Sequence, residues 1–255
     1  IGIDIGSTCA KTVVLNEKKE IIQEFVQPTG WSSVDTAEEI RQKLELNGIN
    51  LSEDSSCCVA TGYGRISVPY ADKTVTEITC HALGAVHLFQ QPDLTVIDIG
   101  GQDTKIIQIE QGFVKDFIMN DKCAAGTGRF LEVMANTLSL RPNEMFDLAR
   151  LGSDTTISSM CTVFAESEVI GLIGKGEPKE NIAYAVVNST IRKVAAQVSR
   201  MNGEMSTFCL TGGLCECDYI REALSKELGN EVISCPDARY AGAIGAALSA
   251  MKIQR

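Results

Sequence analysis

Two segments of the chain carry the same acid, glycine and lysine at the same spacing. Asp4 and Asp98 each precede an Ile-Gly pair, and Lys11 and Lys105 each follow seven residues after their aspartate. The two copies lie 94 residues apart, and a repeat of so long a period indicates two structurally related halves. Two glycine turns, each backed by an acid, can face one another across a cleft, an arrangement that suits a nucleoside triphosphate and its metal ion.

Both turns contain residue types that bind phosphate. Backbone N–H groups cradle a phosphate only where small residues let it come close. Asp4 and Asp98 are predicted to hold the water molecules of a bound Mg²⁺, and Lys11 adds a point charge for a β- or γ-phosphate. A plain hairpin turn is the alternative for either copy alone, but the shared spacing argues against it for both. The predicted phosphate contacts are Ser7, Thr8, Cys9, Lys11, Gly100, Gly101 and Gln102.

Further small residues fit the nucleoside, because glycines let the backbone lie flat against adenine and ribose. Close helix packing is the alternative explanation for the Gly/Ala-rich run near the end of the chain. A G-x-x-x-x-G-K-[ST] loop does not occur in the sequence, which excludes that class of nucleotide site. The candidates for nucleotide binding in this group are Gly126, Thr211, Gly212, Gly213, Gly242 and Ala243.

The elements that position these residues follow from the apolar pattern. Each copy predicts strand, turn, strand, turn, strand, with the later strands at 12–15 and 21–26 and again at 106–109 and 113–119. Helices are predicted at 36–46, with Thr36 as N-cap, and at 76–89, 128–138, 162–173, 182–201, 218–228 and 240–251. The result is an α/β protein of two βββαβα-type lobes, residues 1–92 with 237–255, and residues 93–236.

Composition narrows the class of partner. Hydrophobic residues make up 44% of the chain and charged residues 22%, as in ordinary globular proteins. The net charge of −10 argues against a nucleic-acid or anionic membrane surface. Apolar runs stay well short of the roughly 20 residues that a membrane helix needs. We therefore expect a cytoplasmic protein that binds neither nucleic acid nor membrane.

Ten cysteines without a single C-x-x-C pair are unusual for such a chain. Most are expected to be small core residues. Cys123 and Cys161 differ because each is expected just before a helix, where the helix N-terminus favours a negatively charged thiolate or metal centre. One chain offers two such thiolates, a 4Fe–4S cluster takes four ligands, and a two-fold dimer would supply the rest. Two structural cysteines remain the alternative from spacing alone.

The order of these elements resembles the actin/hexokinase/heat-shock-70 ATPase superfamily: a first phosphate loop, a helix, a second phosphate loop, a Gly-Gly turn and a closing helix. In that superfamily the helix before the second phosphate loop often supplies an acid or amide that orients the attacking water. The resemblance places Glu77 in that role. A solvated helix residue is the alternative for Glu77.

Within that superfamily, nearly the whole chain resembles the activator ATPases of 2-hydroxyacyl-CoA dehydratases, a family that includes ATPase subunits of benzoyl-CoA reductases. The resemblance implies that Cys123 and Cys161 of two subunits bind one 4Fe–4S cluster across a homodimer. It also implies that an electron from ferredoxin or flavodoxin passes into a dehydratase as ATP is hydrolysed to ADP. The segments that carry the resemblance are 60–65, 71–73, 77–82, 98–105, 120–132 and 161–169.

The sequence departs from the family at a few cysteines. Cys9 stands where many relatives have a small alanine, and Cys215 and Cys217 form an extra C-x-C beside the Gly-Gly turn. Rival functions on the same fold are a kinase of a small metabolite such as an amino sugar, and a nucleotide-dependent assembly module like actin. A structural zinc site is disfavoured by the ligand spacing.

Overall fold

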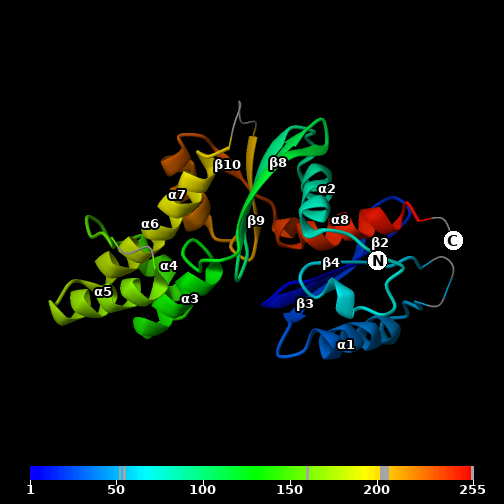
Figure 1. The fold of residues 1–255 in the computed structure, drawn as a ribbon, viewed down its shortest axis with the longest axis horizontal. Coiled ribbons are helices and arrows are strands. Elements are labelled where there is room, and N and C mark those ends of the chain that lie inside the picture. Colours follow the sequence, from blue (N-terminus) through cyan, green and yellow to red (C-terminus); the bar gives the residue numbers. More distant parts are fainter. Residues whose placement is uncertain (52, 54–55, 159–160, 202–206, 254–255) are drawn as a thin grey trace. The chain divides into compact units, whose positions relative to one another are not determined.

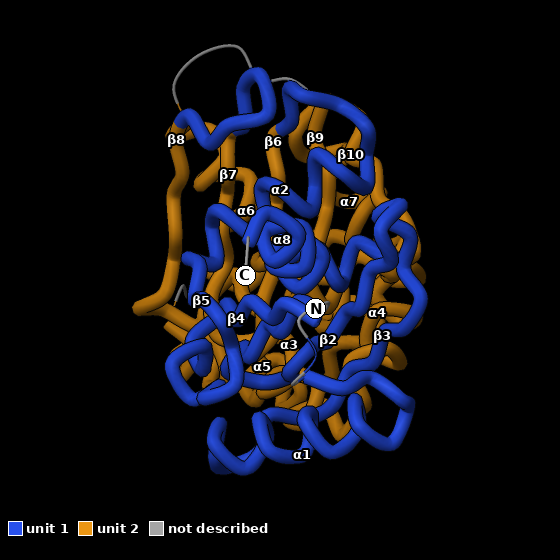
Figure 2. The backbone as a smooth tube through the Cα atoms, turned by 90° about the vertical axis from the view of Figure 1, so that its right-hand side faces the viewer, with its two compact units in different colours: residues 1–94, 109–115, 237–255 blue, residues 95–108, 116–236 orange. Residues whose placement is uncertain are grey.

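The computed structural model describes residues 1–51, 53, 56–158, 161–201 and 207–253. The chain divides into two compact units, drawn in blue and orange in Figure 2. The first holds residues 1–94, 109–115 and 237–255, and the second holds residues 95–108 and 116–236. From the sequence we expect two lobes, residues 1–92 with 237–255 and residues 93–236. That division of the chain into lobes stays a prediction.

The elements of the first unit begin with the expected strand meander, and further strands and helices follow it. Figure 1 labels them along the chain. They are β1 (Gly2–Ile5), β2 (Cys9–Leu15), β3 (Ile21–Pro28), α1 (Ser33–Leu46), β4 (Val59–Thr61), β5 (Lys73–Thr74), α2 (Glu77–Phe89) and, at the chain's end, α8 (Ala241–Ala250), with short 3₁₀ turns at Arg65–Ser67 and Pro236–Tyr240.

The remaining elements begin with a second meander of three strands, whose hairpin tip at 109–115 groups with the first unit. Helices and two further strands follow. They are β6 (Leu94–Ile99), β7 (Thr104–Glu110), β8 (Phe113–Asn120), α3 (Gly128–Thr137), α4 (Pro142–Ala149), α5 (Thr162–Gly174), α6 (Lys179–Val198), β9 (Thr207–Gly212), α7 (Asp218–Leu228) and β10 (Val232–Ile233).

Both sheets have five strands in the same order. The first runs β3-β2-β1-β4-β5, and the second, read from its β8 edge, runs β8-β7-β6-β9-β10. In the first sheet β1 pairs antiparallel with β2, so that Asp4 lies opposite Lys11, and parallel with β4, so that Asp4 lies opposite Thr61. The duplicated fold predicted from the repeat is confirmed, and each aspartate stands next to last in the central strand of its sheet.

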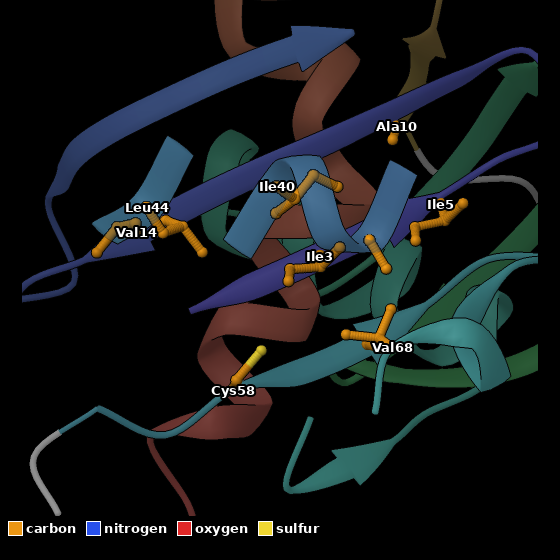
Figure 3. Close-up of a cluster of buried hydrophobic side chains, with 10 residues drawn as sticks. Ile3, Ile5, Ala10, Val14, Ile40, Leu44, Cys58 and Val68 are labelled. Carbon is orange, nitrogen blue, oxygen red and sulfur yellow. The ribbon is translucent and has the colours of Figure 1, made fainter. Parts of the chain in front are cut away.

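The core of the first unit forms where the sheet meets helix α1. Figure 3 shows Ile3, Ile5 and Val14 from the strands with Ile40 and Leu44 from the helix, and all of these side chains are buried. Their spacing on α1 places one apolar face of the helix against the sheet. Burial of such aliphatic side chains contributes about 1.5–3 kcal/mol each.

The start of helix α1 corrects one sequence expectation. The N-cap is Ser32, whose hydroxyl accepts a hydrogen bond from the Asp35 N–H at 3.2 Å, and not Thr36. Thr36 instead lies inside the first turn, buried, and its hydroxyl donates to the carbonyls of Thr29 at 2.6 Å and Ser32 at 2.9 Å. A single hydroxyl proton is shared between these acceptors.

Helix α4 is an element that the sequence analysis did not predict. It spans eight residues and begins with Pro142 at its first position, and the Glu144 side chain accepts a hydrogen bond from the N–H of the N-cap residue Arg141 at 2.8 Å. Both features are local signals of a helix start. The helix was not predicted because its apolar run is short. In the described part of the chain, no helix has both the length and the hydropathy needed to cross a bilayer.

Helices α2 and α8 pack closely through glycines. A Cβ built on Gly84 would lie 1.9 Å from the Ala241 carbonyl oxygen, and one built on Gly245 would lie 1.8 Å from the Cys80 carbonyl oxygen. Side chains larger than hydrogen do not fit between these backbones. Helix packing in the first unit therefore accounts for Gly245 of the Gly/Ala-rich run, and nucleotide binding by Gly242 and Ala243 stays a prediction.

We predict that Gly84→Ala destabilises the protein by about 1–3 kcal/mol or more, because the new methyl group must displace the backbone of α8. Urea unfolding measures the change. Gly171→Ala is the matched control: a Cβ there meets nothing within 4 Å, and it should stabilise helix α5 by about 0.5–1 kcal/mol. Equal effects at both glycines would contradict the close packing of α2 on α8.

Candidate functional site

The first aspartate turn lies at the end of β1. Asp4 is 4% exposed, and the turn after it closes with a hydrogen bond from the Gly6 N–H to the Cys9 carbonyl at 3.1 Å. Ser7 and Thr8, at the tip of this turn, are exposed, and Lys11 on β2 is half-buried. The turn therefore presents small side chains and backbone groups to solvent, beside a buried carboxylate.

Two glycines bring backbone against the Asp4 carboxylate within the first unit. A Cβ on Gly62, which follows β4 with a φ of +84°, would lie 2.5 Å from Asp4 Oδ1. A Cβ on Gly242 would lie 2.5 Å from Asp4 Oδ2 and 2.9 Å from His81 Cε1. The positive φ and the close approach both require glycine at position 62. The carboxylate is thus enclosed by backbone, and no bulky side chain occupies its surroundings at these two positions.

The second aspartate turn repeats this geometry in the second unit. Asp98 is 3% exposed, and the Gly100 N–H donates to the Asp103 carbonyl at 2.9 Å. Thr211, at the end of β9, donates its hydroxyl to Asp98 Oδ1 at 2.9 Å. Gly212 has a φ of +83°, and a Cβ on it would lie 2.7 Å from the same oxygen.

The Thr-Gly pairs at 61–62 and 211–212 are therefore equivalent. Each lies at the end of the strand that adjoins the central strand, and each brings a left-handed glycine against the aspartate of its own half. The sequence analysis named 60–65 as a segment that carries the family resemblance but did not assign Gly62 to the site. The repeated Thr-Gly dipeptide at the end of the fourth strand of each half is the pattern that would have found it.

The two lysines of the repeat have different surroundings. Lys105 is 1% exposed, and its Nζ lies 2.8 Å from Asp103 Oδ2 and 3.4 Å from Asp98 Oδ2. Its first-half counterpart, Lys11, is only half-buried. The difference in burial of the two lysines goes with a difference two residues earlier in the sequence: position 103 is an aspartate where the first copy has Cys9. The buried ammonium group thus balances two buried carboxylates and lies inside the protein.

Other nucleotide candidates are placed as follows. Gly101 is half-buried, Gln102 is exposed, and Gly213 is exposed with nothing near its missing Cβ. Gly242 and Ala243 are buried in α8. Within the first unit the structure brings Gly6, Gly242 and Lys11 around Asp4, and within the second it brings Gly100, Thr211 and Gly212 around Asp98. Their binding roles stay predictions.

Glu77 is the first residue of helix α2 and is half-buried. Its backbone carbonyl lies 3.1 Å from Nδ1 of the buried His81, one turn along the helix. A carboxylate at this position is favoured by the positive end of the helix dipole. The expected placement of Glu77 on the helix before the second phosphate loop is confirmed, and its part in hydrolysis stays a prediction.

The cysteines predicted to hold a metal cluster lie in the second unit. Cys161 is exposed and is the N-cap of α5. Cys123 is half-buried in the loop before α3, but α3 begins only at Gly128, so Cys123 does not stand directly at the helix N-terminus as the sequence suggested. Asn120 fixes this loop by donating to the carbonyls of Cys123 at 2.9 Å and Ala125 at 3.0 Å.

Gly126 orders the same loop. It has a φ of +86°, and a Cβ on it would lie 2.8 Å from Cγ of Lys193 on α6. Its carbonyl accepts the Thr104 hydroxyl at 2.6 Å, which ties the loop to strand β7. Helices α3 and α5, which follow the two cysteines, pack against one another. Cys161 thus stands at the start of one helix of a packed pair, and Cys123 lies in the loop that leads into the other.

The remaining cysteines are less suited to metal binding. Burial raises the pKa of the Cys80 thiol to about 12 and also raises the pKa of Cys217, the N-cap of α7. Cys215 is buried, and Cys9 is half-buried at the start of β2. Across the described residues, no three cysteines of one chain come together as ligands of a metal ion.

We predict that Lys105→Met lowers the free energy of unfolding by about 3–5 kcal/mol, because it leaves the Asp98 and Asp103 carboxylates buried without their cation. Urea unfolding at pH 7 measures this. Lys115→Met, which removes an exposed 3.0 Å ion pair with Glu110, is the control and should cost less than about 1 kcal/mol. Similar losses for both variants would show that Lys105 does not carry the charge balance of this cluster.

Comparison with known proteins agrees with this geometry. The (R)-2-hydroxyglutaryl-CoA dehydratase activating ATPase of Acidaminococcus fermentans is 44% identical over 257 residues, covering 99% of this chain and 96% of its own. The crystal structure of component A of that dehydratase has a TM-score of 0.89 at 41% identity, with 98% of each chain covered. The activator of the 2-hydroxyisocaproyl-CoA dehydratase from Clostridium difficile with bound ADPNP has a TM-score of 0.88 at 33% identity, covering 100% of this chain and 97% of that one.

More distant structures share only the fold. A ROK family glucokinase from Streptomyces griseus, in complex with glucose and AMPPNP, has a TM-score of 0.63 at 17% identity, covering 99% of both chains. The expected actin-like, two-sheet ATPase fold is therefore confirmed. Residues 1–250 match the BadF/BadG/BcrA/BcrD ATPase family along their whole length. Together with the paired aspartate turns, this shows that the chain belongs to the BadF/BadG/BcrA/BcrD ATPase family.

Proposed function

We propose that the chain is an ATP-hydrolysing electron-transfer activator of a 2-hydroxyacyl-CoA dehydratase. The observation that carries the proposal is the pair of equivalent aspartate turns in a chain of this ATPase family. Relatives that match almost end to end are named as activators of 2-hydroxyglutaryl-CoA and lactoyl-CoA dehydratases. The kinase alternative is not favoured, because the likeness to a glucokinase extends to the fold alone.

The residues of both turns fit a magnesium–nucleotide complex. Each turn combines a buried carboxylate with glycines whose missing side chains leave the backbone accessible. We assign Asp4 and Asp98 to the water shell of Mg²⁺ and the exposed tip of the first turn to phosphate. Lys11 is the lysine of the repeat that we assign to phosphate, since Lys105 is engaged by Asp98 and Asp103.

Glu77 is assigned to the attacking water. A carboxylate at the N-terminus of a helix is held in a fixed direction by the helix, and it can accept a proton from water. Half-burial leaves it reachable by solvent, as this role requires. In phosphoryl transfer the protein contributes chiefly by orienting the reacting groups and stabilising the charge of the transition state, and little by covalent chemistry.

Cys123 and Cys161 fit a shared iron–sulfur centre. Each chain presents two thiols, one in the loop before α3 and one at the start of α5, so that two chains would supply four ligands to one 4Fe–4S cluster. When bound, the cluster would supply a one-electron carrier. Within each chain, the Asn120 hydrogen bonds hold the backbone at Cys123, and Cys161 stands at the N-cap of α5, where the positive end of the helix dipole favours a thiolate.

Helix α5 supports the proposed homodimer. Four of its large apolar side chains are between 46% and 67% exposed: Val163, Phe164, Ile170 and Ile173. Monomers seldom leave so much apolar surface on one helix uncovered. Because Cys161 caps this same helix, a second copy packed here would bring a second pair of thiols to the same place. We propose a cytoplasmic protein, with ferredoxin or flavodoxin as its electron donor.

We predict that Glu77→Gln slows ATP turnover by about 10²-fold or more while ATP still binds, because the amide cannot take a proton from water. Steady-state phosphate release and calorimetric binding of ATP measure the two quantities. Glu180→Gln removes a carboxylate from the first turn of α6 and serves as the control, with turnover expected to stay unchanged. An unaltered turnover number in Glu77→Gln would return Glu77 to the role of an ordinary helix residue.

We predict that Cys123→Ser and Cys161→Ser each lose iron and weaken the dimer, because the cluster itself links the subunits. Iron and acid-labile sulfide are measured on protein purified without oxygen, and mass is measured by sedimentation. Cys217→Ser is the control and should keep its iron, because burial holds Cys217 as a thiol. Full iron in Cys123→Ser, or a monomer with a complete cluster, would instead favour a site within one chain.

A further inference from the structure

Thr29 holds the first phosphate turn from behind. It follows the last residue of β3 and is 6% exposed. Its backbone N–H donates to the Thr8 carbonyl at 3.0 Å, and its hydroxyl donates to the Gly6 carbonyl at 2.7 Å. One residue therefore binds two carbonyl oxygens of the turn that is assigned to phosphate.

These two hydrogen bonds fix the direction of the N–H groups that a phosphate would use. In a trans peptide the C=O and the following N–H point in opposite directions across one plane. Because the Gly6 carbonyl points to Thr29, the N–H of Ser7 points away from it. The same holds for the Thr8 carbonyl and the N–H of Cys9. The side chains of Ser7 and Thr8 are exposed, so solvent reaches the tip of the turn.

Thr29 is itself held by helix α1. Its carbonyl accepts the hydroxyl of the buried Thr36 at 2.6 Å. Gly30 follows with a φ of +60° and turns the chain toward the helix start. Helix α1 is anchored in the core by Ile40 and Leu44. A chain of hydrogen bonds thus connects a rigid helix to the phosphate turn.

The second half reaches the same result by a different route. There the carbonyls of Gly100 and Gly101 accept hydrogen bonds from the backbone N–H groups of Gly128 at 2.9 Å and Arg129 at 2.8 Å, at the start of α3. Both halves therefore fix the carbonyl of the turn's first glycine from outside the turn. Only in the first half does that bond depend on a side chain, the hydroxyl of Thr29.

We propose that Thr29 is a positioning residue of the nucleotide site: its hydroxyl sets the peptide plane of Gly6 and Ser7 so that the Ser7 N–H is directed at a bound phosphate. This inference rests on the proposed phosphate role of the first turn. Thr29 itself lies behind the turn and contacts carbonyl oxygens. Its effect on binding passes through the backbone, and it is felt only by ligands that carry phosphate.

The test compares Thr29→Val with Thr29→Ser. Valine keeps the shape and the backbone N–H but removes the hydroxyl, and serine keeps the hydroxyl. We expect Thr29→Val to bind ADP and ADPNP about 10-fold more weakly, the scale of one hydrogen bond, and Thr29→Ser to stay within about twofold of wild type. Adenosine, which has no phosphate, should bind equally to all three proteins, as measured by calorimetry.

Tyr70→Phe is the matched control. It removes a hydroxyl that donates to the Ala37 carbonyl of α1 at 2.6 Å, also in the first unit but with no bond to the turn. We expect it to lower the unfolding midpoint much as Thr29→Val does while ADP affinity stays unchanged. In ATP turnover, Thr29→Val should raise KM by about the loss in affinity and change kcat by less.

Three results would overturn the inference: unchanged ADP affinity in Thr29→Val, an equal loss for ADP and adenosine, or no rescue by serine. A wild-type chain that binds adenosine but gains nothing from its phosphates would instead overturn the phosphate role of the first turn, and with it the inference. The two failures are therefore distinguishable, since the second is seen in the wild-type protein before any variant is made.

Discussion

Burial of a carboxylate near the end of the central strand is the constraint around which each half of this protein is built. Asp4 and Asp98 are both almost fully buried, and an isolated buried charge is costly. At Asp98 the Thr211 hydroxyl and the Lys105 ammonium group offset that cost, and in both halves backbone at a glycine lies close to the carboxylate. Gly62 and Gly212 are left-handed for this reason, because only glycine lets the strand-end turn approach the carboxylate.

The two halves share this plan but have diverged at one position. Asp103 in the second turn pulls Lys105 into the interior, whereas Cys9 at the matching place leaves Lys11 near the surface. One lysine therefore stabilises the fold, and the other is open to a ligand. The same divergence appears behind the turns, where Thr29 supplies a side-chain hydroxyl and the start of α3 supplies backbone N–H groups. The two halves therefore share the geometry of the aspartate turn, but different chemical groups hold that turn in place.

The proposed coupling of hydrolysis to electron transfer has a physical basis in the second unit. The loop with Cys123 is tied through Gly126 to Thr104, and Thr104 stands next to Lys105 on β7. A nucleotide bound to the second turn would thus lie a few residues from Thr104, which is hydrogen-bonded to the loop that contains the proposed cluster ligand Cys123. Such coupling requires the nucleotide to bind two arrangements of the chain with different affinities. Packed and hydrogen-bonded groups between the two sites can transmit that difference.

Much of this protein follows from the sequence by itself. The 94-residue repeat predicted two related halves, the aspartate turns and the duplicated strand order, because period and alternation are local properties of the chain. The placement of Glu77 and of Cys161 at helix starts also followed from local pattern. Tertiary structure alone decided the rest. The burial of Lys105, the approach of Gly62 to Asp4 and the bonds from Thr29 to the turn join residues far apart in sequence, and their energies arise only when packing excludes water from between them.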